Sequence, residues 1–173
     1  MLNSVHEQAA ALGVGDPLVP STDIYMTAIL SIGSKSLSHV LSTIDRCKDR
    51  LINIGQQSEQ ARRQIIASVV DFWSDHPGTA VNIVDKLLNY SIITPMAVIQ
   101  WALQDRMDRG RALASSQVYE MVSITMFKVT NRVRQVLRER NNMSLPFEQR
   151  KQIDDALPRE RQGMLDLFAA IDV

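Results

Sequence analysis

Apolar residues recur at intervals of three and four positions from about Ser21 to Asn142, and this spacing constrains the fold more than any other feature. An α-helix has about 3.6 residues per turn, so the spacing places the apolar side chains on one face of each helix. No stretch of four or more residues alternates cleanly between apolar and polar, as a half-buried β-strand does. The pattern therefore predicts an all-α protein.

Breaks in the pattern divide this segment into six predicted helices. The short connections between them favour antiparallel neighbours, which predicts stacked helical hairpins. Pairs of helices at about 40 residues per pair match HEAT-type units, so the expected architecture is a HEAT-like α-solenoid of the ARM-repeat type. The helices are expected to begin at or near residues whose side-chain oxygen can cap a helix: Ser21, Ser36, Ser58, Thr79, Thr94 and Ser115.

Local signals predict further details of these helices. Thr22 and Asp23 are alternative caps for the first helix, and Pro95, at the first helical position, strengthens the start of the fifth. Gly55 is expected to end the second helix. The predicted inner face of the first helix consists of Ile24, Ala28, Ile29 and Ile32.

The chain is expected to have three parts. Residues 1–20 contain two glycines and two prolines at a spacing that helices tolerate poorly, which predicts a flexible leader. Residues 21–142 form the predicted HEAT-like helical domain. Residues 143–173 carry separated apolar residues among charged ones, with Pro158 as an interruption, and predict an amphipathic helical arm. A long C-terminal helix would then project from the domain.

Charge and cysteine content exclude several function classes. Lys and Arg number 19, as do Asp and Glu, so a formal charge of zero excludes a general electrostatic attraction to nucleic acid or membranes. Cys47 is the single cysteine, which excludes an internal disulfide and fits a reducing compartment. No apolar run reaches the roughly 18 residues that span a bilayer, and the N-terminal residues lack a signal-peptide pattern. We therefore expect a soluble intracellular protein with no membrane partner.

Candidate catalytic groups do not combine into a known arrangement. His39 and Cys47 are eight residues apart on one predicted helix, about 12 Å of helical rise, whereas a nucleophile and its base must lie within hydrogen-bond distance. Gly33–Ser36 superficially resembles a phosphate loop but lacks the upstream glycine and the preceding strand. Asp154 and Asp155 lie in a charge-rich, solvated segment that does not favour acid catalysis.

The histidines indicate no metal site either. His6, His39 and His76 have no carboxylate or thiol at the spacing of metal ligands. We therefore predict a protein that is not an enzyme and that has no catalytic residue, metal, cofactor or small-molecule substrate.

A locally basic segment ends the sixth predicted helix. Cations in the last turns of a helix interact favourably with its dipole, so a purely structural role is one interpretation. A contact with RNA phosphate or with an acidic partner is the other. Glu139 is the single acidic residue in this segment. The candidate contact residues, which we call the basic cluster, are Lys128, Arg132, Arg134, Arg138 and Arg140.

Several segments, in order along the chain, carry a resemblance to a known family. They are Gly33–His39 (GSKSLSH), Phe72–Pro77 (FWSDHP), Val84–Leu87 (VDKL), Ile99–Trp101 (IQW) and Leu157–Arg161 (LPRER), with Leu167 and Phe168 beyond the last. Together they cover about Ile24 to Ile171. The set resembles the last helical domain of the large subunit of the eukaryotic nuclear cap-binding complex, in the form seen in fungi.

The resemblance implies a HEAT-like domain of the type found in the middle of the large translation-initiation scaffold, within a subunit that is a scaffold and not an enzyme. It implies a small RRM-type subunit as partner, whose aromatic side chains sandwich the methylated guanine of the mRNA cap. Capped RNA would then be bound only indirectly. The resemblance further implies a role in mRNA processing, splicing and export, and a nuclear location with shuttling to the cytoplasm.

Alternative functions stay open at this point. Members of the family have two preceding helical domains, and the resemblance ends before the helices that complete the last one, so we expect a domain that is incomplete at its C-terminus. The alternative to a cap-binding scaffold is a general α-solenoid adaptor for protein interactions, or a remnant without any RNA role.

Overall fold

Every regular element that the structure describes is helical. The structure is a computed structural model that describes residues 18–106, 115–141 and 146–172, and within these ranges it contains no strand. The predicted all-α class is therefore confirmed. Apart from its last three residues, the predicted leader lies outside the described residues. The chain divides into two compact units, Met1–Ala97 and Val98–Val173, with the boundary inside helix α6.

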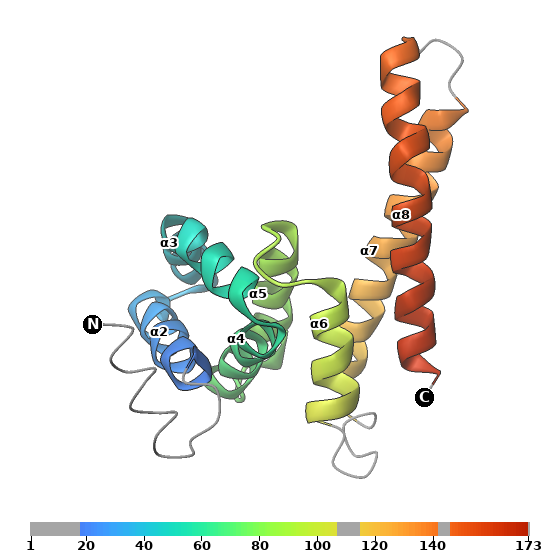
Figure 1. Ribbon diagram of the computed structural model, residues 1–173. Coiled ribbons are helices and arrows are strands. Elements are labelled where there is room, and N and C mark those ends of the chain that lie inside the picture. Colours follow the sequence, from blue (N-terminus) through green and yellow to red (C-terminus); the bar gives the residue numbers. More distant parts are fainter. Residues whose placement is uncertain (1–17, 107–114, 142–145, 173) are drawn as a thin grey trace, which may run out of the picture. The chain divides into compact units, whose positions relative to one another are not determined.

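The first unit is a stack of helices joined by short turns. Its helices are α2 (Leu18–Gly33), α3 (Leu37–Gln57), α4 (Glu59–Phe72) and α5 (Pro77–Asn89), followed by α6 (Pro95–Gln100) at the boundary. Helix α2 packs against α3 and α4, and α5 packs against both α3 and α4 (Figure 1). These contacts confirm the predicted stack of helical hairpins. The largest fully buried side chains of this unit include Met26, Leu30, Ile44, Leu51, Ile65, Ile66, Ile83 and Leu87.

Three predicted helix starts are confirmed by their caps. The Ser36 side chain accepts a hydrogen bond from the His39 N–H at 3.2 Å, at the start of α3. Ser58 accepts from the Gln60 and Ala61 N–H groups, at 3.1 and 3.4 Å, and opens α4. Before α6, Thr94 Oγ1 accepts from the Ala97 N–H at 3.1 Å. Each bond satisfies an amide that has no partner inside its helix.

The predicted start and inner face of the first helix are wrong. Helix α2 begins at Leu18, so Ser21, Thr22 and Asp23 lie inside it and none is its cap. The predicted Ile24 and Ile32 are 71% and 73% exposed, and Ala28 is exposed as well. Of the four residues in the predicted face, only Ile29 is buried. The other buried residues of α2 are Thr22, Met26, Leu30 and Gly33.

A close backbone contact explains which face of α2 is buried. A Cβ atom added at Gly33 would overlap the backbone of Val40, so this glycine allows α3 to approach the end of α2. Met26, Ile29 and Leu30 lie on the same face as Gly33, three to seven residues before it, and this face is the one that meets the neighbouring helices.

Two further boundary predictions are wrong for local reasons. Gly55 does not end the second helix, because α3 continues to Gln57 and Ser58 is its C-terminal capping residue. Thr79 does not cap the fourth helix, because Pro77 occupies its first helical position and His76 is the capping residue. Proline has no N–H to leave unsatisfied there, and the capping residue lies three positions earlier than expected.

The second unit is dominated by two long helices that run side by side (Figure 1). After the π-helical segment η1 (Trp101–Asp105) follow α7 (Ser116–Arg140) and α8 (Phe147–Ile171). The predicted interruption at Pro158 is wrong, since α8 continues through it. The buried side chains of the pair are Val118, Met121, Thr125, Val133 and Val136 of α7 and Leu157 and Leu167 of α8.

We predict opposite stability effects for alanine at two glycines inside helices. Alanine inside a helix normally stabilises by about 0.5–1 kcal/mol relative to glycine. At Gly55 the added Cβ would collide with the carbonyl oxygen of Ile92, so Gly55→Ala should lower the free energy of unfolding by about 1–3 kcal/mol. At Gly163 no atom outside the neighbouring residues and the surrounding backbone of α8 lies within 4 Å of an added Cβ, so Gly163→Ala should stabilise. Urea denaturation followed by circular dichroism measures both, and a gain in stability for Gly55→Ala would contradict the close approach.

Candidate functional site

The whole basic cluster lies on the C-terminal half of α7. Arg132, Arg134, Arg138 and Arg140 are exposed, and Lys128 is half-buried. Helix α7 buries Val133 and Val136 on the face that lies between these cations. Because successive residues turn by about 100° around a helix, the cations divide into a set that flanks the buried face and a set that points away from it.

Arg132 and Arg140 flank the buried face and pair with carboxylates of α8. The Arg140 Nε donates to Asp154 Oδ1 at 2.7 Å, and the Arg132 Nε donates to Glu160 Oε1 at 3.4 Å. The later arginine pairs with the earlier acid, so the two ion pairs match an antiparallel arrangement of α7 and α8. All four side chains are at least one-third exposed, and such pairs contribute about 0.2–1 kcal/mol each.

Arg134 and Arg138 lie roughly opposite the buried face and point away from α8. They are four residues apart, so one follows the other along the helix by about one turn. The Arg134 Nη1 donates to Asn131 Oδ1 at 3.3 Å, and Arg138 has no hydrogen bond or ion pair with any described residue. Phe127, seven residues before Arg134, is 64% exposed on the same side. We call Phe127, Arg134 and Arg138 the outward face of α7.

Sequence reasoning found the cluster but missed its division. Taken alone, the segment from 128 to 140 contains five cations and one acid. The acids that neutralise two of these cations, Asp154 and Glu160, belong to a separate helix, and only the register of α8 against α7 brings them there. The available signal was the helical spacing of Ile153, Leu157 and Leu167, which places both acids beside the apolar face of α8.

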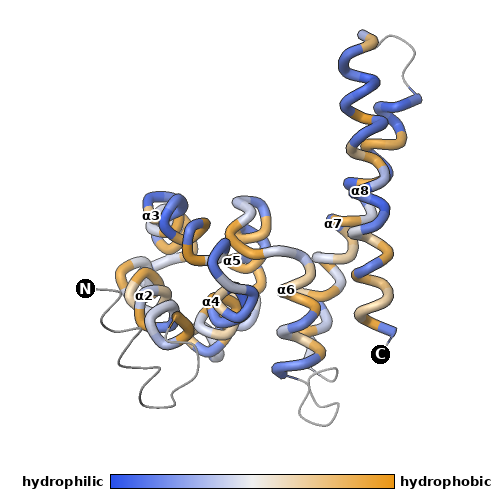
Figure 2. The backbone as a smooth tube through the Cα atoms, viewed as in Figure 1, coloured by the Kyte–Doolittle hydropathy of each residue, from blue (hydrophilic) through white to orange (hydrophobic). Residues whose placement is uncertain are grey.

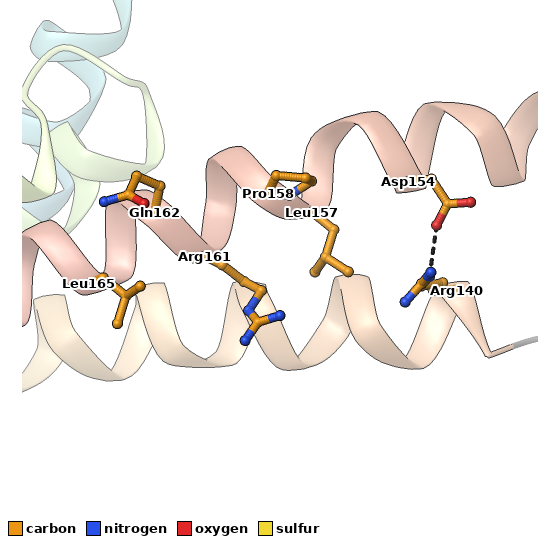
Figure 3. Close-up of a pocket in the computed structure, with 7 residues that line it drawn as sticks. All are labelled: Arg140, Asp154, Leu157, Pro158, Arg161, Gln162 and Leu165. Atoms are coloured by element: carbon orange, nitrogen blue, oxygen red, sulfur yellow. Dashed lines mark hydrogen bonds and ion pairs between the residues drawn. The ribbon is translucent and has the colours of Figure 1, made fainter.

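A groove of about 460 Å³ lies beside the Arg140–Asp154 pair (Figure 3). Leu157, Arg161 and Leu165 point from α8 toward α7 in this view, and the ion pair closes one end. The groove is lined by Arg140, Asp154, Leu157, Pro158, Arg161, Gln162 and Leu165. It combines an apolar base with guanidinium groups, which suits a protein segment better than a small polar substrate.

Comparison with known proteins decides the family. A family model described as MIF4G like matches residues 1–172, nearly the whole chain. The chain belongs to the MIF4G-like family. This match, with the helical stack described above, confirms the predicted HEAT-like architecture.

The MIF4G-like chain is also similar to nuclear cap-binding protein subunit 1 of several organisms. It is 27% identical to the protein of Schizosaccharomyces pombe over 70% of this chain, 26% identical to that of Xenopus tropicalis over 83%, and 29% identical to that of Anopheles gambiae over 69%. The predicted resemblance to this family is therefore confirmed. The matches cover 14–18% of these relatives, so the chain spans less than a fifth of their length.

His39 and Cys47, both on α3 of this MIF4G-like chain, contact different partners. The Nδ1 atom of His39 lies 2.8 Å from Ser36 Oγ, at the helix start. The Cys47 side chain is half-buried and forms a hydrogen bond with Tyr25 of α2. Among the described residues, no group of three His, Cys, Asp or Glu side chains is placed to hold a metal ion. Within the same part of the chain, no helix is long and apolar enough to cross a membrane.

The environment of Tyr25 changes its acidity. Burial, followed by the hydrogen bond and the charge of Cys47, raises the pKa of Tyr25 above its ordinary value, while Arg50 lowers it. The Arg50 guanidinium lies over the Tyr25 ring, 5.1 Å from its centroid. The folded protein therefore favours the neutral phenol of Tyr25. The resulting contribution of Tyr25 to the free energy of unfolding is present below pH 10, and it is lost as the pH rises through the pKa of Tyr25 in the folded state.

We predict a late-titrating tyrosine that disappears in Tyr25→Phe. The raised pKa should delay part of the tyrosinate absorbance at 295 nm to a pH above the ordinary value of about 10. In the Cys47→Ala control the delay should shrink without vanishing, because burial, the larger cause, remains. Spectrophotometric titration of the folded protein measures the effect, and an unchanged titration curve for Tyr25→Phe would contradict it.

Proposed function

We propose that this chain is a non-enzymatic scaffold element of a nuclear mRNA cap-binding complex. Its role is to hold a small RRM-type subunit that binds the 5′ cap, so that capped RNA is bound indirectly. The location that follows is the nucleus, with shuttling to the cytoplasm, and the processes served are mRNA processing, splicing and export. The observation that carries the proposal is the similarity to cap-binding subunit 1 of yeast, frog and mosquito over at least two-thirds of this chain.

Within the proposal, the basic cluster supplies the partner contact. Lys128, Arg132, Arg134, Arg138 and Arg140 remain the candidates, and the geometry favours two of them. Arg132 and Arg140 already pair with α8, whereas Arg134 and Arg138 present their guanidinium groups to solvent. Two guanidinium groups one helical turn apart match paired carboxylates on a partner protein, since each can bind a carboxylate with two parallel hydrogen bonds.

The exposed Phe127 favours a protein partner over RNA phosphate at this face. Aromatic and arginine side chains are the residues most enriched where protein interfaces gain their binding energy. The outward face of α7 contains one aromatic side chain and two arginines, and no acidic side chain. An acidic surface on the small subunit, with an apolar side chain to cover Phe127, is the complement that this face requires.

We predict that reversing the two outward charges weakens the complex. The chain is co-expressed with the small RRM-type subunit from the same source and applied to size-exclusion and cap-analogue columns. The wild-type chain should elute with the subunit and be retained on the cap analogue. Arg134→Glu with Arg138→Glu should reduce the affinity by about tenfold or more, because like charges then face the acidic partner.

A control variant separates this effect from net charge. Lys151→Glu with Arg159→Glu makes the same change in formal charge on exposed positions of α8, and it should bind as the wild type does. Circular dichroism should show equal helicity for all three proteins. Unaltered binding by the Arg134 and Arg138 variant would refute the assigned contact. A folded wild-type chain that stays separate from the small subunit would refute the scaffold role and favour a general α-solenoid adaptor.

A further inference from the structure

Helix α8 carries two parallel rows of residues at alternating steps of four and three, which is the spacing of a coiled-coil seam. The first row faces α7, and its members are buried or half-buried except for the last, which is 39% exposed: Ile153, Leu157, Glu160, Met164, Leu167 and Ile171. The second row, which we call the outer seam, lies one position further around the helix and is exposed throughout: Asp154, Pro158, Arg161, Leu165, Phe168 and Asp172.

The outer seam is apolar at the centre of its C-terminal half. Asp154, at its start, already pairs with Arg140 of α7. Beyond Pro158, Leu165 and Phe168 are 54% and 50% exposed, and apolar residues mark this end of α8 in Figure 2. Arg161 and Asp172, on either side of them, have no side-chain hydrogen bond or ion pair with any described residue. The seam thus has two exposed apolar side chains between one free cation and one free anion.

This order of residues is complementary to itself when reversed. Each position of the seam either begins or ends a four-residue step. In an antiparallel coiled coil, each layer pairs a position of the first kind on one helix with a position of the second kind on the other helix. Aligned in this way, Leu165 meets Phe168 of a second copy, and Arg161 meets Asp172 of that copy. The symmetry repeats both contacts, which gives two apolar layers in the centre and an ion pair at each end.

Other alignments of the same seam oppose like groups. A parallel pair places Arg161 against Arg161 and Asp172 against Asp172. An antiparallel pair shifted by seven residues opposes Asp154 and Asp172 of the two copies and places Leu165 against the charged Arg161. Like charges placed directly opposite each other are costly, so the charges select a single register.

We propose that the outer seam of α8 joins two copies of this chain in an antiparallel, two-fold symmetric dimer. The proposal depends on the spacing and exposure of α8 residues and does not require the cap-binding role. Four layers bury less surface than a standard stable interface, so the dimer should be weak and visible only in a concentration series. If a different protein or solvent alone covers the seam, the purified chain stays monomeric, and the experiment distinguishes both cases from the dimer.

We predict a dimer whose charges can be exchanged between copies. Sedimentation equilibrium of the full chain from about 1 μM to 1 mM should show reversible dimerisation. Arg161→Asp places two acids at each end of the seam, and Asp172→Arg places two arginines there. Each variant alone should raise the dimer dissociation constant by about tenfold or more. An equal mixture of the two variants should associate as the wild type does, since each end then pairs Asp with Arg.

Arg159→Asp makes the same charge change on another face of α8 and should leave dimerisation unchanged. A wild-type chain that stays monomeric over the whole range would overturn the proposal, as would a dimer that Arg161→Asp does not weaken. Failure of the mixture to associate would refute the antiparallel register. These results leave the binding of the small subunit untouched, so each proposal can fail without the other.

Discussion

The packing of α8 along α7 determines what the second unit presents to solvent. It buries Val133 and Val136 against the side of α8 that carries Leu157 and Leu167, and so fixes which faces of both helices remain exposed. The same register brings Asp154 and Glu160 beside two of the arginines. Without this packing Arg132 and Arg140 would lack their carboxylate partners on α8. With it, Arg134 and Arg138 of the outward face are the arginines of the cluster that form no ion pair with a described residue, so the candidate site follows from an apolar contact.

Cap chemistry and periodicity were predictable from the sequence because both are local. Ser36, Ser58 and Thr94 each bond to amides two or three residues ahead, and no distant part of the chain is needed to place them. The inner face of α2 was not predictable in this way. It depends on Gly33 lying against Val40, and the continuation of α3 through Gly55 places that glycine against Ile92, a residue 37 positions away. Glycine signals a helix end and a close approach equally well, and only the packed partner distinguishes them.

The candidate site shows the same limit. Its five cations could be identified from the sequence, but their division into paired and outward sets required the register of a second helix. Pro158 was a further obstacle, because a proline inside a helix costs about 3 kcal/mol and normally predicts a break. Helix α8 continues nevertheless, since Leu157 and Leu167 are buried on the two sides of the proline and a break would expose them.

The outward face of α7 and the outer seam of α8 are separate surfaces of one helix pair. The first lies on the side of α7 that points away from α8, and the second lies on α8, next to the row that faces α7. A partner bound through Arg134 and Arg138 therefore leaves Leu165 and Phe168 uncovered, and a second copy on the seam leaves both arginines free. The two binding events share no residue, so they couple only if one of them changes the packing of α7 on α8. A dimeric chain would then present two identical basic faces, and any acidic partner with two sites would bind it with increased avidity.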